Sequence, residues 1–219
     1  LNREIIADYL FVFGEKTKEE MLSIGLKGEI IVSGMPKIKS EINIEAVSNY
    51  IKEKKPYVFI ALSGIGLLTS KQHHMEIVSV IFQTAKKFTE INWIVKLHPK
   101  DNEGNYYSPP KNVKILSNSE LKKNNITNTD LIQNSIATVT GGSTIAFDSL
   151  LLNKQVITLD LKDEFSNVSH IKDGLTFHAK NLKEFEDQIN KVQQGVEIDN
   201  ISQRLSYYYY KYDDNSYSA

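Results

Sequence analysis

Short apolar runs alternate with helical patterns along most of the chain, from Pro56 onward. The runs are rich in β-branched and aromatic residues, which predicts strands at 57–62, 92–97, 113–116, 136–139 and 156–159, with a shorter one near 175–177. Helical patterns occupy about 71–88, 130–132, 145–152, 181–193 and 199–210. Strands that are apolar on both sides and alternate with helices are typical of a parallel sheet buried between two helical layers. The sequence therefore predicts an α/β fold: a Rossmann-like parallel sheet with helices on both faces.

The beginning of the chain fits this pattern less well. It predicts a strand at 9–13, a helix at 16–25 and a strand at 30–32, before a helix at about 42–54 leads to Pro56. We interpret residues 1–35 as the tail of a separate amino-terminal domain with its linker, and residues 36–219 as the main domain.

Composition and charge narrow the range of functions. The 26 basic and 27 acidic residues are interspersed and leave a net charge of −1, so we expect no nucleic-acid partner. No apolar run is long enough to span a bilayer. The absence of cysteine excludes disulfides and thiol catalysis, and it agrees with the reducing cytoplasm, where we expect the protein to act.

A glycine turn between a predicted strand and a predicted helix is the first candidate site. Gly141 and Gly142 end the strand, and Ser143 or Thr144 is expected to cap the helix that follows. Backbone N–H groups, two hydroxyls and the positive end of a helix dipole then lie together, which suits a phosphate. The alternative is an ordinary capped helix after a glycine turn.

Two more loops leave the carboxyl ends of predicted strands and carry suggestive residues. Ser63-Gly64-Ile65-Gly66 is only part of a dinucleotide-binding fingerprint, so it predicts a glycine loop beside a ligand or a plain turn. Lys96 precedes His98-Pro99, where the imidazole can donate to a phosphate or act in acid–base chemistry, or make only a structural hydrogen bond. These loops share one edge of a parallel sheet with the 141–144 turn.

Other polar residues have simpler interpretations. Asp148 lies one turn after Thr144, and is either a ligand for a sugar hydroxyl or a partner of the helix dipole. The adjacent His73 and His74 face different ways on a helix, which favours structural roles over a metal site. His170 and His178 are expected to lie in solvent.

Together these residues resemble a known family. The family motifs are similar to Val95–Asp101, to Gly141–Asp148 and to the following Asn153–Ile157. The segment from Phe13 to Pro36 resembles the end of an amino-terminal domain with its linker, and 213–216 resembles an Asp-Gly-x-Ser motif without its glycine. The resemblance is to bacterial surface-polysaccharide glycosyltransferases of the GT-B architecture, in the group with His-Pro and Ser-Ser/Thr motifs. That group includes sialyl-, polysialyl- and Kdo-transferases and CDP-glycerol glycerophosphotransferases.

The resemblance implies that residues 36–219 are the carboxyl-terminal domain, which binds a nucleotide-activated donor. It implies that His98 contacts the donor phosphate, stabilising the leaving group, and that Ser143 and Thr144 bind phosphate. We expect a CMP- or CDP-linked donor and no metal or other cofactor. The carbohydrate acceptor and the catalytic base would lie on the amino-terminal domain, so this chain would bind donor without turnover. The full-length protein would work in capsule or surface polysaccharide synthesis, with peripheral membrane association as one possibility.

Two alternatives stay open at this point. One is a nucleotide-sugar 2-epimerase of the same architecture, which needs further acid–base carboxylates. The other is a non-catalytic nucleotide-binding module. The sequence also departs from the family at Gln155, where proline is usual, and at Asp148, which stands where glutamate is frequent and leaves a shorter side chain for a ribose contact.

Overall fold

The chain forms two compact units. The computed structural model describes residues 8–34, 44–51, 55–66 and 69–209. Unit 1 comprises residues 1–40 with 199–219, and unit 2 comprises residues 41–198. The 213–216 motif and the Met35-Pro36 link lie outside the described residues. The domain division predicted after residue 35 stays a prediction.

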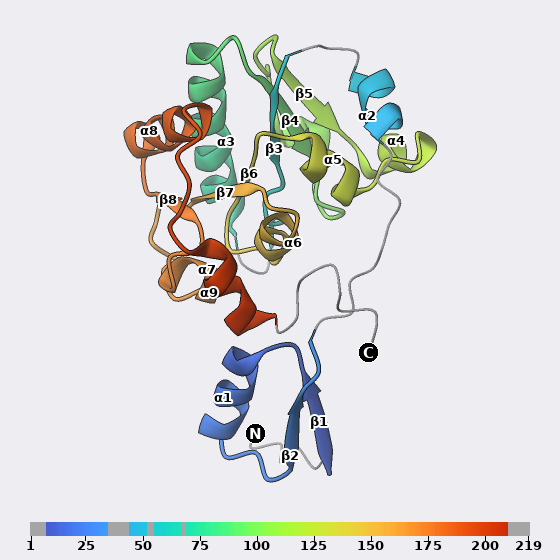
Figure 1. Ribbon diagram of the computed structural model, residues 1–219. Helices are drawn as coiled ribbons and strands as arrows, with labels where there is room; N and C mark the ends of the chain where they lie inside the picture. The colour runs from blue at the N-terminus through green and yellow to red at the C-terminus, as the bar shows by residue number, and fades with distance from the viewer. Residues whose placement is uncertain (1–7, 35–43, 52–54, 67–68, 210–219) are drawn as a thin grey trace. The chain divides into compact units, whose positions relative to one another are not determined.

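Unit 2 is built on a parallel sheet of six strands in the order β5-β4-β3-β6-β7-β8 (Figure 1). The strands are β3 (Tyr57–Ile60), β4 (Asn92–Lys96), β5 (Val113–Leu116), β6 (Ala137–Thr140), β7 (Gln155–Leu159) and β8 (Phe177–Ala179). The chain proceeds outward from β3 through β4 to β5, returns to place β6 beside β3, and proceeds outward on the other side. The strand order therefore reverses between β3 and β6.

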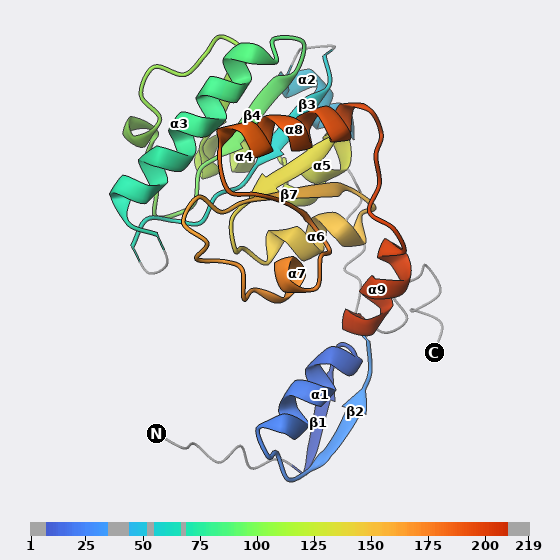
Figure 2. The same cartoon turned by 90° about the vertical axis from the view of Figure 1, so that its left-hand side faces the viewer.

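Helices cover both faces of this sheet. One face packs against α3 (Lys71–Lys87) and α8 (Leu182–Gln193), which lie in front of the sheet in Figure 2. The opposite face packs against α2 (Ile44–Ile51), α4 (Asn118–Lys123), α5 (Asn128–Asn134) and α6 (Ile145–Leu151). The 3-10 helix η1 (Glu103–Asn105) and the short α7 (Ser169–Lys172) lie within connections. The predicted Rossmann-like sheet with helices on both faces is confirmed.

Alternation along the central strands builds two cores from one sheet. Val58 and Ile60 of β3 enter the core beneath α3 and α8, whereas Tyr57 and Phe59 enter the core on the other face. Trp93 of β4 is fully buried in the first of these cores. Each large side chain buried this way contributes about 1.5–3 kcal/mol. Burial on both faces explains why these strands appear in the sequence as continuous apolar runs.

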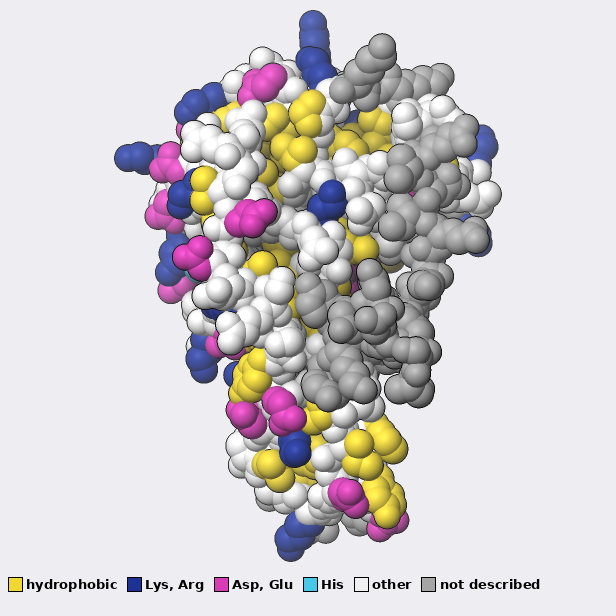
Figure 3. All heavy atoms as spheres, in the orientation of Figure 1, with side chains coloured by type: hydrophobic (Ala, Val, Ile, Leu, Met, Phe, Trp, Pro, Cys, Tyr) yellow, Lys and Arg dark blue, Asp and Glu magenta, His cyan; other side chains and the backbone are white. Residues whose placement is uncertain are grey.

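Unit 1 is a smaller α/β element. Strands β1 (Tyr9–Val12) and β2 (Glu29–Val32) pair in parallel and are connected by α1 (Glu15–Ser23), beside which α9 (Ile201–Tyr208) packs. A Cβ on Gly14 would lie 2.2 Å from the Tyr208 carbonyl oxygen, so glycine permits this close approach. Apolar side chains gather over β1 (Figure 3), where Tyr9 and Phe11 are 61% and 65% exposed. Within the described part of the chain, no helix is both long and apolar enough to cross a membrane.

Candidate functional site

The candidate site lies at the carboxyl edge of the sheet, around the reversal of strand order. The loops after β3, β4 and β6 all leave from this edge, because the three strands are parallel neighbours. Hydrogen bonds fasten the ends of β3 and β6: the Ala61 N–H donates to the Val139 carbonyl at 3.0 Å, and the Thr140 hydroxyl donates to the Ala61 carbonyl at 2.8 Å. In open α/β sheets ligands bind at such a reversal.

His98 and Gly64 are in direct contact across two of these loops. A Cβ on Gly64 would lie 2.2 Å from His98 Nδ1, so the imidazole packs against bare backbone. The Lys100 backbone N–H donates to Nδ1 at 3.2 Å. Because Nδ1 accepts this bond, a neutral ring carries its proton on Nε2. His98 is half-buried, and no hydrogen bond of Nε2 is recorded among the described residues, so in this tautomer Nε2 is left as a donor.

The glycine turn of residues 141–144 lies beneath an aromatic ring. Cβ atoms on Gly141 and Gly142 would lie 3.0 and 2.7 Å from ring atoms of Phe165, which is buried. Among the described residues, the backbone N–H groups of Gly142, Ser143 and Thr144 have no recorded protein acceptor. These amides are free to bind an anion.

The expected cap of the following helix is much weaker than predicted. Thr144 precedes α6 with helical dihedral angles and makes no capping bond through its side chain. The Ser143 hydroxyl accepts from the Ile145 N–H at a long 3.4 Å. Both hydroxyls therefore stay largely available. With only seven residues, α6 supplies a small dipole, so the free amides matter more than the helix as a whole.

The remaining predicted residues are more scattered. Ser63 is half-buried, Pro99 is exposed, and Gly66 has a φ of +130° with open space around its Cβ position. Asp148 lies at the surface of α6, where the surrounding protein still removes enough water from its carboxyl to raise the pKa. No contact recorded among the described residues joins Ser63 or Asp148 to His98.

Lys96 is not in recorded contact with the other candidate residues that the structure describes. Its ammonium donates to the Leu97 carbonyl at 3.4 Å, and burial lowers its pKa. The side chain lines a depression of about 540 Å³ beside α4, together with polar residues of the α4–α5 region: Asn118, Lys122, Asn125, Thr127 and Asn128. No contact recorded for the described residues joins Lys96 to His98.

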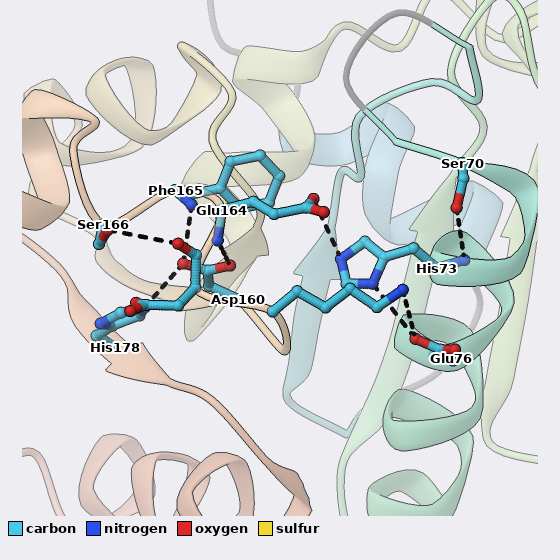
Figure 4. Close-up of polar contacts among 10 residues, drawn as sticks. Ser70, His73, Glu76, Asp160, Glu164, Phe165, Ser166 and His178 are labelled. Atoms are coloured by element: carbon cyan, nitrogen blue, oxygen red, sulfur yellow. Dashed lines mark hydrogen bonds and ion pairs between the residues drawn. The ribbon is translucent and has the colours of Figure 1, made fainter.

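A loop that sequence reasoning missed holds Phe165 in place (Figure 4). Asp160, fully buried at the end of β7, accepts from the backbone N–H groups of Glu164 and Phe165 at 2.8 and 2.9 Å. The loop also contacts the first turns of α3: Glu164 lies 3.8 Å from His73, and Lys162 lies 3.2 Å from Glu76. An aspartate directly after a strand was the available signal, but its partners are backbone groups.

His170 is also different from the prediction. Instead of lying in solvent it is fully buried, and its ring meets the Phe147 ring edge-on at 5.5 Å. Burial lowers the pKa of His170. The Gly141 backbone opposes this shift electrostatically, although their geometry is not that of a hydrogen bond. His170 is therefore a buried ring beside Phe147 whose surroundings favour its neutral form.

One acidic grouping among the described residues has the spacing of a metal site. Asp160, Asp163 and His178 place ligand atoms within 4.8 Å of one another. Both Asp160 oxygens already accept backbone N–H groups, and Lys180 pairs with Asp163 at 2.7 Å. Because these contacts account for both carboxylates, the grouping has a structural explanation.

The fold is shared with solved structures of UDP-GlcNAc 2-epimerases and of a wall teichoic acid polymerase. A UDP-GlcNAc 2-epimerase from Methanocaldococcus jannaschii, in complex with UDP-GlcNAc and UDP, matches with a TM-score of 0.63 and 20% identity, over 85% of this chain and 54% of that one. The UDP-GlcNAc 2-epimerase from Neisseria meningitidis, bound to UDP-GlcNAc, matches with a TM-score of 0.59 and 16% identity, over 87% and 54% of the two chains. The wall teichoic acid polymerase TagF matches with a TM-score of 0.58 and 13% identity, over 92% and 53%.

These likenesses define the class of fold. Unit 2 is a Rossmann-like α/β half of the GT-B type. The chain spans about half the length of the solved structures that it matches. No protein-family model matches the chain, and neither does any curated protein sequence.

Proposed function

We propose that unit 2 binds the phosphate groups of a nucleotide-activated donor at the carboxyl edge of β3, β4 and β6. One observation carries this proposal: His98 lies on the bare backbone of Gly64, at the reversal of strand order, with Nε2 left as a donor. A backbone without side chains and a directed N–H are what a phosphate oxygen needs. In this proposal the free amides of residues 142–144, which follow the neighbouring strand β6, contribute to the same binding surface.

The chemistry that follows is stabilisation of a leaving group. When a sugar or polyol phosphate leaves its nucleotide, negative charge grows on the phosphate oxygens. The His98 Nε2–H and the free amides would bind that charge in a fixed geometry, without a metal. A hydrogen bond to a charged group is worth about 1.5–3 kcal/mol. Each of these N–H groups should therefore change the affinity for the nucleotide-activated substrate by roughly tenfold or more.

Among enzymes with this fold, we favour a glycosyltransferase with a CMP- or CDP-linked donor, acting in surface or capsular polysaccharide synthesis. Its acceptor would bind to the amino-terminal domain, and the full-length protein would work in the cytoplasm, with peripheral membrane association as a further proposal. The motifs around His98 and Ser143 support this choice. A 2-epimerase is the alternative, because solved neighbours of this fold carry that name. Epimerisation needs free acid–base carboxylates, whereas the carboxylate of Asp101, close to His98 in sequence, is fully hydrogen-bonded. A non-catalytic binding module is the third possibility.

Calorimetric titration of the purified chain with CMP, CDP, UDP and GDP tests the proposal. His98→Ala should weaken binding by roughly tenfold or more, because one charge-assisted donor is lost. His98→Gln and His98→Asn form a matched pair: the glutamine amide reaches the position of Nε2, whereas the asparagine amide reaches only that of Nδ1. Glutamine should therefore retain more affinity than asparagine. Ser143→Ala tests the glycine turn.

The nucleotide that binds best separates the candidate enzymes. A preference for CMP or CDP supports the transferase. A preference for UDP favours the epimerase, which is then assayed with the full-length protein by following the configuration at C2 of UDP-GlcNAc. Binding that is unchanged in His98→Ala, or absent in a folded wild-type chain, contradicts the proposed site.

A further inference from the structure

A buried carboxylate lies three residues after His98. The Asp101 side chain is 1% exposed, and every side of its carboxylate is occupied. Oδ1 accepts from the Asn102 N–H at 2.9 Å and from the Asn105 side-chain amide. Oδ2 accepts from the Tyr106 hydroxyl at 2.8 Å and faces His74 Nε2 at 3.4 Å. Asp101 is therefore the centre of a polar cluster inside the protein.

This cluster connects the His98 loop to α3. The Asp101 backbone N–H donates to the His98 carbonyl at 2.8 Å, so the carboxylate and His98 belong to one tight turn. His74 comes from the first turns of α3, and its ring meets the edge of the Tyr106 ring at 5.5 Å. His73, its neighbour, points instead toward Glu76 and Glu164 (Figure 4). The turn that carries His98 is thus fastened through His74 to the same helix that His73 joins to the loop of Phe165.

The pKa shifts of His74 and Tyr106 favour the neutral forms of both groups beside the Asp101 carboxylate. Burial lowers the pKa of His74, although Asp101 opposes that shift. Burial and the Asp101 carboxylate both raise the pKa of Tyr106, so its hydroxyl keeps its proton and donates. Neutral donors arranged around one carboxylate fix its orientation more narrowly than apolar packing would.

Stability alone does not account for this arrangement. Burying a carboxylate with polar partners is rarely more stabilising than filling the same volume with apolar side chains. A polar cluster, in contrast, restricts the backbone attached to it to one conformation. Here the backbone so held is the 98–101 turn, whose Lys100 N–H selects the tautomer of His98.

We propose that Asp101, with Tyr106 and His74, positions His98 by holding the 98–101 turn against α3. Asp101 does not touch the ligand and acts through His98, so it is a positioning residue. This inference rests on the proposed function, in which His98 Nε2 donates to a phosphate.

Two variants and one matched control test it. Tyr106→Phe removes only the hydroxyl that donates to Asp101, and Asp101→Asn removes the charge while keeping the volume. Tyr57→Phe is the control: it removes another buried hydroxyl, which donates to the Leu131 carbonyl at 2.6 Å, in the same unit. Tyr106→Phe should weaken binding of CDP or UDP, whichever the wild type prefers, by about fivefold, whereas Tyr57→Phe should leave it within about twofold.

A double-mutant cycle separates positioning from general loss of structure. In a His98→Ala background, Tyr106→Phe should cause no further loss of affinity, because the residue through which it acts is gone. Additive losses would show that Tyr106 affects binding by another route, and would overturn the proposal.

A measurement without ligand keeps this test independent of the proposed function. Nitrogen-15 NMR of the His98 ring should show the Nε2–H tautomer in the wild type and in Tyr57→Phe, with a protected Lys100 amide. Tyr106→Phe and Asp101→Asn should give mixed tautomers and faster exchange of that amide. If both variants keep the wild-type His98 signals, the positioning role is refuted whatever the binding data show. If the signals change but neither nucleotide binds the wild type, the proposed function fails and the positioning role stands.

Discussion

At the scale of single residues, the candidate site depends most on the contact between His98 and Gly64. The ring has one nitrogen satisfied by the Lys100 N–H and one face against glycine backbone. A side chain at position 64 would occupy the place of Nδ1, so the glycine is required by a side chain from another loop. Position 64 therefore offers a way to displace His98 without altering the imidazole itself.

We predict that Gly64→Ala reduces nucleotide affinity about as strongly as His98→Ala, because its Cβ would lie 2.2 Å from His98 Nδ1. Such a separation is impossible, so the ring must move. Gly104→Ala is the control on the His98 loop, since its Cβ would meet only the Asn102 side-chain oxygen, at 3.1 Å. Calorimetry of the two variants measures the difference. Full affinity in a folded Gly64→Ala variant would show that His98 is not held as described.

The buried His170 predicts a specific response to acid. Burial lowers its pKa in the folded protein below the ordinary value of 6.5, so below pH 6.5 the unfolded chain binds the proton more readily than the native state. Stability should therefore be fully present above pH 6.5 and fall as the pH is lowered from there. The slope due to this one group is at most about 1.4 kcal/mol per pH unit.

His170→Leu should remove that part of the slope while preserving apolar packing. Urea unfolding at pH 7.5, 6.5 and 5.5 measures it, and His74, whose pKa burial also lowers, accounts for slope that remains. Phe147→Leu disturbs the same ring contact but keeps the imidazole, so it should lower stability at every pH and keep more of the slope than His170→Leu does. Parallel pH profiles for the wild type and His170→Leu would contradict the prediction.

For single residues, the sequence indicates which ones are candidates for the site more readily than it indicates their burial and contacts. The loops of Gly64 and His98 were expected to share one edge of the sheet, since both follow parallel strands, and the structure places the two residues in contact. The burial of His170 was not predictable, because the four-residue helix around it shows no periodicity and the ring that it meets comes from α6. The role predicted for Lys96 stays a prediction, and its side chain lines the depression beside α4.

At the scale of elements, strands were easier to predict than helix ends. Runs rich in apolar and β-branched residues located β3, β4, β5, β6 and β7, and of these β3, β4, β6 and β7 are buried along most of their length. Helix α4 was missed, although Ser117 and Glu120 form a complete capping box before it. A six-residue helix with Leu121 as its single buried residue has too short an apolar stripe to show periodicity.

The loop between β7 and α7 shows why connections are harder still. Asp160 gives this loop its shape through two backbone N–H groups, and the result is that Phe165 lies on Gly141 and Gly142. Neither the capping geometry nor the destination of the ring follows from periodicity, since loops have none. The sequence indicated the glycines but not the ring that closes over them.

For the whole molecule, the order of elements predicted the parallel sheet of unit 2 but not that the last helix, α9, belongs to unit 1. The alternation of strands and helices from Pro56 determined a parallel sheet, and the return of β6 to the side of β3 placed the candidate loops at its centre. Helix α9 was counted with the main domain, whereas its contacts group it with α1 in unit 1. The contact of Tyr208 with Gly14 joins residues nearly 200 positions apart, and no local pattern shows such a pairing.

The two units should unfold separately, and Trp93 makes this measurable. It is the single tryptophan of the chain and is fully buried in unit 2, so its fluorescence reports on that unit alone. Unit 2 has helices on both faces of its sheet, whereas unit 1 relies on two strands, α1 and α9. A two-stranded sheet is marginal by itself, so unit 1 should unfold at lower urea.

We therefore expect residues 41–198 expressed alone to show the same Trp93 unfolding midpoint as the full chain. Circular dichroism of the full chain should show an earlier loss of helix that the fragment lacks. Because the nucleotide contacts proposed here all come from unit 2, the fragment should also retain the nucleotide affinity of the full chain. A fragment with a lower Trp93 midpoint would show that unit 1 stabilises the sheet. A fragment that folds but has lost its nucleotide affinity would mean that part of the binding site belongs to unit 1.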